Sequence, residues 1–148
     1  MKNSFRVSQG NPLENRFSFL GCFLVDIVFV VDAAGSIVLE NWSRVTAFIN
    51  RFIARMDISG DCAMVSIVTF GDAATVQFDL SAYDDPGRLR RAIEELDVRS
   101  QPRNFADAIR TVRSDVFRDT AGDRRDAANV CVLVTDGNSG DEKQVSIL

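Results

Sequence analysis

The sequence predicts an α/β fold with a doubly wound, mostly parallel sheet, helices on both faces and one antiparallel edge strand. Three runs carry this prediction, residues 26–31, 63–70 and 130–135, because each is mainly apolar at successive rather than alternate positions. Strands of that kind are covered on both faces, as in parallel sheets. Helical stretches separate them, which gives right-handed crossovers with residues 26–31 at the centre of the sheet.

The overall composition indicates one globular domain and excludes some classes of function. A length of 148 residues suits a single domain with a substantial core. A formal net charge of −4 argues against nucleic acid as a partner, because such binding depends on clustered Lys and Arg. The absence of histidine excludes every mechanism with an imidazole base, so we expect no enzyme of that kind.

The first half of the chain predicts one crossover and a hairpin. After the central strand, apolar residues recur at helical spacing from Leu39 to Met56, which predicts a helix packed on the sheet. The strand 63–70 then leads through Gly71-Asp72 into residues 75–80, where apolar positions alternate. So short a connection predicts a hairpin, and therefore an antiparallel edge strand.

The second half predicts two more helices and a last strand. Asp84-Asp85-Pro86 has the acids and the proline that begin a helix. A second helical stripe begins at Phe105, and the charged stretch 120–128 reads as a surface loop. The strand 130–135 follows and ends at Asp136-Gly137.

Two of the predicted strands thus end in an acid followed by a turn. Asp32 and Asp136 would lie at the carboxyl ends of neighbouring parallel strands, about 4.8 Å apart. Two carboxylates that close repel each other unless a cation or a proton lies between them. Open α/β sheets bind their ligands at this edge, so we expect the functional site there.

Taken in order, these segments resemble the von Willebrand factor type A domain (VWA domain), and most closely the versions in matrilins and collagen VI. The resemblance covers Asp26 to about Glu142. It is carried by residues 26–32, 65–70, 76–80 with Tyr83, Asn104 ahead of Ala108-Ile109, and 132–137. It implies a Rossmann-like fold whose usual later strands and helices are missing from this chain, which leaves the fourth strand as an uncovered apolar edge. We therefore expect either a fragment or a partner chain that supplies the missing layer.

The resemblance also implies a metal-ion-dependent adhesion site, in which Mg²⁺ binds oxygen ligands and a carboxylate of the partner. Its first Asp, second Ser and late Asp correspond to Asp32, Ser36 and Asp136. Its other two hydroxyl positions are occupied here by Ala34 and Arg103. Mg²⁺ requires near-octahedral oxygen coordination, so the site is expected to be partial.

Arg103 leaves two interpretations open. Its guanidinium can act as a built-in cation that neutralises the acid pair without metal. At about 4 Å from one of the two carboxylates, its attraction amounts to roughly 4 kcal/mol before the cost of desolvation. Alternatively it points into solvent above a weak metal site. In either case the expected partner-binding face comprises Asp32, Ser36, Arg103 and Asp136.

The function that the resemblance implies is a non-enzymatic adhesion module of a secreted extracellular matrix protein, with collagens and other matrix proteins as partners. One alternative is a phosphate-handling hydrolase with Asp32 as nucleophile. Against it, the sequence has no glycine-rich phosphate loop and no lysine near the site. Another alternative is a degenerate domain with a purely structural role.

The remaining expectations concern the termini and the cysteines. Residues 1–22 are expected to form a poorly ordered arm ahead of the domain, 23–148, with no clear signal peptide and no membrane span. The uncovered fourth strand would allow self-association. Cys131 is expected to be a buried thiol beyond disulfide reach of Cys62, whereas Cys22 pairs with Cys62 or with a region outside this sequence.

Overall fold

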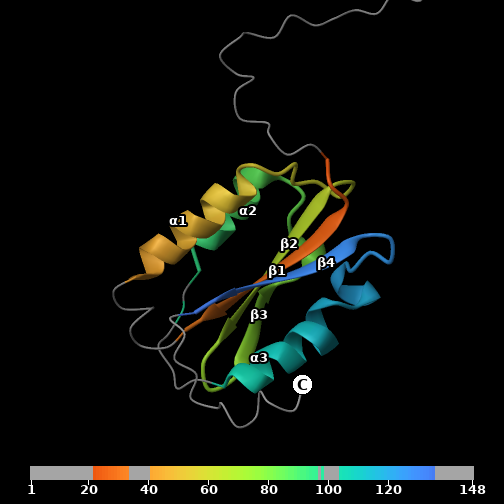
Figure 1. Cartoon of the computed structure of the whole chain (residues 1–148). Helices are drawn as coiled ribbons and strands as arrows, with labels where there is room; N and C mark the ends of the chain where they lie inside the picture. Colours follow the sequence, from red (N-terminus) through yellow and green to blue (C-terminus); the bar gives the residue numbers. More distant parts are fainter. Residues whose placement is uncertain (1–21, 34–40, 97, 99–103, 136–148) are drawn as a thin grey trace, which may run out of the picture.

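A computed structural model of the chain describes residues 22–33, 41–96, 98 and 104–135 (Figure 1). Its sheet has the strand order β3-β2-β1-β4. β1 is parallel to both β2 and β4, and β2 is antiparallel to β3. The strands are β1 (Val25–Asp32), β2 (Ala63–Phe70), β3 (Ala74–Phe78) and β4 (Ala128–Val134). The predicted mostly parallel sheet with one antiparallel edge strand is confirmed.

Helices cover both faces of this sheet. α1 (Trp42–Ile53) and α2 (Pro86–Glu94) lie together over one face, and α3 (Phe105–Thr111) lies over the other (Figure 1). α3 continues into a π-helical segment, η3 (Val112–Val116). The side chains of β1 alternate between the two resulting cores: Ile27, Phe29 and Val31 face α1 and α2, whereas Val28 and Val30 face α3 and η3.

Double coverage explains the sequence pattern of the two central strands. Every residue of β2 is buried, as is every residue of β1 after Val25. β3, at the edge, is only half-buried along most of its length. A continuous apolar run is therefore needed in β1 and β2, and an alternating pattern suffices in β3.

Two of the helices begin where local capping chemistry predicts. Asp85 precedes α2, and its Oδ1 accepts a hydrogen bond from Arg88 N at 2.7 Å. Asn104 precedes α3, and its Oδ1 accepts from Asp107 N at 3.1 Å. Each cap satisfies a backbone N–H that has no partner within its helix.

Some predicted boundaries differ from the observed ones. β3 ends at Phe78 rather than near Leu80, because Leu80–Ala82 forms a 3₁₀ turn, η2, whose Leu80 is buried. The expected surface loop 120–128 begins inside another 3₁₀ turn, η4 (Asp119–Ala121), and β4 already starts at Ala128. The expected arm, residues 1–22, lies outside the described residues except for Cys22.

β4 is the edge strand next to β1 in the described part of the chain, as expected for the fourth strand. In the described part of the chain it pairs with β1 alone, and Val130 and Leu133 are 38% and 41% exposed. Cys131 is a free thiol and is exposed, so the prediction of a buried thiol is wrong. The apolar run predicted coverage on both faces, which the exposure of Val130 and Leu133 contradicts. The uncovered outer edge is present as expected among the described residues.

Candidate functional site

The candidate site lies at the carboxyl edge of the sheet, where β1 and β4 end next to each other. Their parallel register pairs Val31 with Val134, which places Asp32 beside Thr135. Thr135 Oγ1 donates a hydrogen bond to Asp32 Oδ2 at 3.0 Å. The chain then continues from Thr135 directly into Asp136, the second predicted acid.

Asp32 is completely buried at the end of the central strand. Its position is fixed by the sheet itself, because Ala33 N, immediately after it, donates to Phe70 O at 2.7 Å. A buried carboxylate is costly unless hydrogen bonds or a positive charge stabilise it. Thr135 supplies one such hydrogen bond, which makes it part of the site.

The other predicted site residues lie outside the described residues. These are Ser36 and Asp136, expected as ligands, and Ala34 and Arg103, which replace the expected hydroxyl groups. Their arrangement around Asp32 therefore remains a prediction. Of the predicted partner-binding face, the structure places only Asp32.

Thr135 is a site residue that sequence reasoning missed, although the signal was present. It follows the apolar run 130–134 and precedes Asp136. Once residues 130–135 are paired in parallel with the central strand, Thr135 falls opposite Asp32. A carboxylate and a hydroxyl at one strand end are oxygen donors of the kind that Mg²⁺ binds, so the described residues fit such an ion.

At the opposite, amino-terminal edge the structure holds a buried ion pair that the sequence did not reveal. Arg124 Nη2 lies 2.6 Å from Asp26 Oδ1, and Arg124 N donates to Asp26 Oδ2 at 2.7 Å. Asp26 is completely buried, and the Arg124 side chain is 16% exposed. The guanidinium also donates to Gly60 O, Val25 O and Cys62 O. It thus ties three chain segments together and is a structural feature.

A disulfide joins Cys22 to Cys62 at the same edge, with their Cα atoms 5.0 Å apart. Of the two pairings left open by the sequence, the structure has the one within the chain. Among the described helices, none is both long enough and apolar enough to cross a lipid bilayer.

Comparison with known proteins identifies the fold and its relatives. The family model described as "von Willebrand factor type A domain" matches residues 26–148. Among curated proteins, Matrilin-3 of Homo sapiens is 29% identical over 121 residues, covering 80% of this chain and 25% of that protein. Integrin alpha-1 of Gallus gallus is 35% identical over 118 residues, covering 79% and 41% respectively.

A third relative is the Collagen alpha-6(VI) chain of Homo sapiens, 29% identical over 116 residues, which are 78% of this chain and 5% of that protein. The chain therefore spans less than half the length of each of these relatives.

Among solved structures, proximal thread matrix protein 1 from the mussel byssus, with a zinc-occupied MIDAS motif, matches with a TM-score of 0.73. The identity is 27%, over 85% of this chain and 33% of that one. The strand order of this chain, its buried Asp32 and the match to the family model all support the same assignment. The chain belongs to the von Willebrand factor type A domain family.

Proposed function

We propose that this chain is a non-enzymatic adhesion module of an extracellular matrix protein, and that it binds its partner at the carboxyl edge of the sheet. The observation that carries the proposal is the buried Asp32 at the end of β1, hydrogen-bonded to Thr135 at the end of β4. The relatives named as matrilin and collagen VI chains support a matrix protein, outside the cell, with matrix proteins such as collagens as partners.

The metal site of this module is partial. Asp32, Ser36 and Asp136 supply oxygen ligands, whereas Ala34 and Arg103 stand where hydroxyl ligands are expected. A related protein whose MIDAS motif is described as zinc-occupied supports a divalent cation at this place in the fold. Here the fixed positive charge of Arg103 opposes a bound cation and takes its role beside the acids.

The proposed replacement of the metal ion by Arg103 can be tested by restoring the two missing hydroxyl groups. Isothermal titration with Mg²⁺ and Mn²⁺ should show no micromolar binding to the native chain. The double variant Ala34→Ser/Arg103→Thr should bind both ions, since it regains two oxygen ligands and loses a charge. A matched control is Ala34→Ser/Arg118→Thr, which removes a different, exposed arginine and should not gain binding.

Two results would contradict the proposed site. Micromolar Mg²⁺ binding by the native chain would show that Arg103 does not replace the metal. Unchanged binding by Asp32→Asn in the double-variant background would remove Asp32 from the ligand set. Asn has the same shape as Asp, so it keeps the packing of a completely buried side chain while removing its charge.

Adhesion itself is tested with collagen-coated surfaces. The native chain should be retained, and Arg103→Glu should lose retention because it reverses the charge of the expected binding face. Arg118→Glu makes the same charge change away from that face and should retain binding. Turnover of an aryl phosphate that Asp32→Asn abolishes would instead favour a hydrolase.

We also propose that β4 allows self-association. Its outer flank is uncovered in the described part of the chain, and no residue from Ala128 to Val134 is charged or proline. Edge strands that avoid pairing usually carry such residues. Analytical ultracentrifugation should show concentration-dependent dimers, which Leu133→Lys should weaken.

A further inference from the structure

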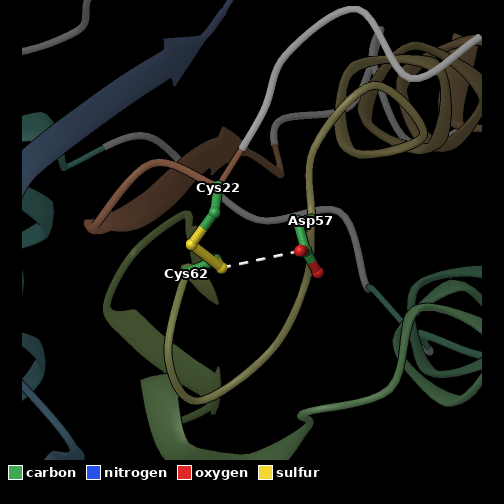
Figure 2. Close-up of side chains that lie close together, drawn as sticks. All are labelled: Cys22, Asp57 and Cys62. Carbon is green, nitrogen blue, oxygen red and sulfur yellow. Dashed lines mark hydrogen bonds between the residues drawn. A yellow bond between two sulfur atoms is a disulfide. The ribbon is translucent and has the colours of Figure 1, made fainter. Parts of the chain in front are cut away.

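A second cluster of metal-ligating side chains lies at the amino-terminal edge of the sheet, opposite Asp32. It comprises Cys22, ahead of β1, with Asp57 and Cys62, which flank the loop between α1 and β2 (Figure 2). The ligand atoms of the three residues all lie within 4.8 Å of one another. We propose that reduction of the Cys22–Cys62 disulfide turns this cluster into a binding site for a thiophilic divalent cation such as Zn²⁺.

Asp57 already lies next to Cys62 Sγ in the disulfide-bonded structure, and this contact can become a hydrogen bond after reduction. Asp57 Oδ2 lies 3.5 Å from Cys62 Sγ, as the dashed line in Figure 2 marks. A disulfide sulfur has no proton and cannot donate a hydrogen bond, whereas a thiol can. In the described part of the chain, no Lys or Arg forms an ion pair with this carboxylate. The carboxylate is therefore available to a cation.

The spacing of the two cysteines suits a metal as well as a disulfide. In tetrahedral coordination with Zn–S bonds of about 2.3 Å, two sulfurs lie about 3.8 Å apart. The Cα atoms of Cys22 and Cys62 are 5.0 Å apart, so side-chain rotation alone can open the sulfurs to that separation. Two thiolates and one carboxylate leave a fourth position for water, as in open zinc sites.

The loop that carries two of the ligands is held in place independently of the disulfide. Ala63 N donates to Asp57 O at 2.9 Å, which closes the loop on itself. Arg124 Nη2 and Val25 N both donate to Cys62 O, at 2.8 and 3.2 Å. Reduction therefore leaves the backbone of Asp57 and Cys62 anchored, and the positive charge of Arg124 is already balanced by Asp26.

The chemistry requires an external two-electron reductant, for example a dithiol. Its two sulfurs give up two electrons and two protons and join in a new S–S bond, while the Cys22–Cys62 bond breaks and becomes two thiols. The metal ion then displaces the two thiol protons, which leave to water, and binds the thiolates. Cys22 and Asp57 are exposed, so both the reductant and the ion can reach the cluster.

The two edges of the sheet differ in the donor atoms that they present. Thiolates favour Zn²⁺ or Co²⁺, whereas oxygen donors around Asp32 favour Mg²⁺. The proposed thiolate site does not depend on the function proposed for the carboxyl edge, because it shares no residue with it.

Co²⁺ titration of the full chain tests the proposal, with Cys131→Ser as the background to remove the third thiol. A phosphine reduces the disulfide to two thiols and becomes a phosphine oxide, with the oxygen and the two protons supplied by water. After this treatment the chain should develop a thiolate-to-cobalt charge-transfer band that Zn²⁺ abolishes. The untreated, disulfide-bonded chain should show none. Asp57→Asn should weaken Co²⁺ binding by more than about tenfold, the loss that even outer-shell partners cause.

Matched variants separate the site from general effects. Asp61→Asn changes the same charge in the same loop, outside the cluster, and should leave the affinity unchanged. Cys22→Ser replaces the exposed cysteine and should abolish the band while circular dichroism reports a folded chain. Absence of the band in the reduced chain, its persistence in Cys22→Ser, or equal affinities of Asp57→Asn and Asp61→Asn would overturn the proposal.

Discussion

At the scale of single residues, Asp26 and Arg124 form a buried ion pair. It joins the first strand to the segment before the last one, across 98 positions of sequence. Burying two charges costs free energy, and this pair is tolerated because hydrogen bonds occupy most of its donors and acceptors. Removing one partner leaves the other buried and uncompensated.

We therefore expect Arg124→Met to lower the free energy of unfolding by about 3–5 kcal/mol, as for other broken buried pairs. Urea unfolding followed by circular dichroism measures this change. The neighbouring Arg125 also forms an ion pair, with Asp119, but their side chains are 87% and 66% exposed. Arg125→Met should leave the stability nearly unchanged, because exposed pairs contribute little. Equal effects of the two variants would contradict the assigned role of Arg124.

Cys131 permits a test of the environment on β4. Burial raises the pKa of its thiol, although the residue as a whole is exposed. The thiolate is the reactive form, so a raised pKa keeps the folded thiol protonated, and unreactive, to higher pH. Alkylation of the oxidised chain by iodoacetamide should rise with a midpoint at higher pH in the folded protein than in urea. Coincident midpoints would mean that the strand does not shield the thiol.

At the scale of elements, the sequence predicted well what local chemistry determines. The starts of α2 and α3 were predictable because Asp85 and Asn104 cap their own helices. β1 and β2 were predictable because coverage on both faces requires successive apolar residues. β4 has the same apolar pattern without the same burial, since the pattern does not specify which neighbour is present.

The contacts that escaped prediction join segments far apart in the sequence. Nothing in the charged stretch around Arg124 distinguishes it from a solvated loop, and its partner Asp26 reads as an ordinary strand start. Thr135 could have been inferred, because parallel pairing with β1 places it beside Asp32. Asp57 could not, because its approach to the cysteines depends on how the loop folds.

The turn after η4 contains a glycine in a backbone conformation that other residues rarely adopt. Gly122 has φ +97°, and a Cβ there would lie 2.7 Å from Ser81 N. Gly122→Ala should cost more than about 1–2 kcal/mol, the left-handed penalty alone, because a backbone clash is added. Gly60→Ala is the control, since a Cβ at Gly60 would meet nothing within 4 Å. Thermal unfolding that ranked the two variants equally would contradict this account of the turn.

At the scale of the whole molecule, the sheet separates the two candidate cation sites. β1 carries Asp32 at its carboxyl end, while Cys22 precedes its amino-terminal end and is bonded to Cys62 ahead of β2. The disulfide spans 40 positions and encloses both β1 and α1. It therefore restricts a large part of the unfolded chain as well as shaping one edge of the folded one.

Loss of this disulfide should consequently lower the free energy of global unfolding. The chain-entropy model predicts that Cys22→Ser lowers the free energy of unfolding by about 4 kcal/mol for a loop of this length. Domains typically have a total stability of about 5–15 kcal/mol, and one in the upper part of that range remains folded after such a loss. Binding of Zn²⁺ to the reduced native chain would recover part of the lost stability. Urea unfolding of Cys22→Ser and Cys131→Ser provides the comparison, because the second variant removes an exposed free thiol and should change little. If both variants unfolded at the urea concentration of the native chain, the disulfide would not constrain the unfolded state as proposed.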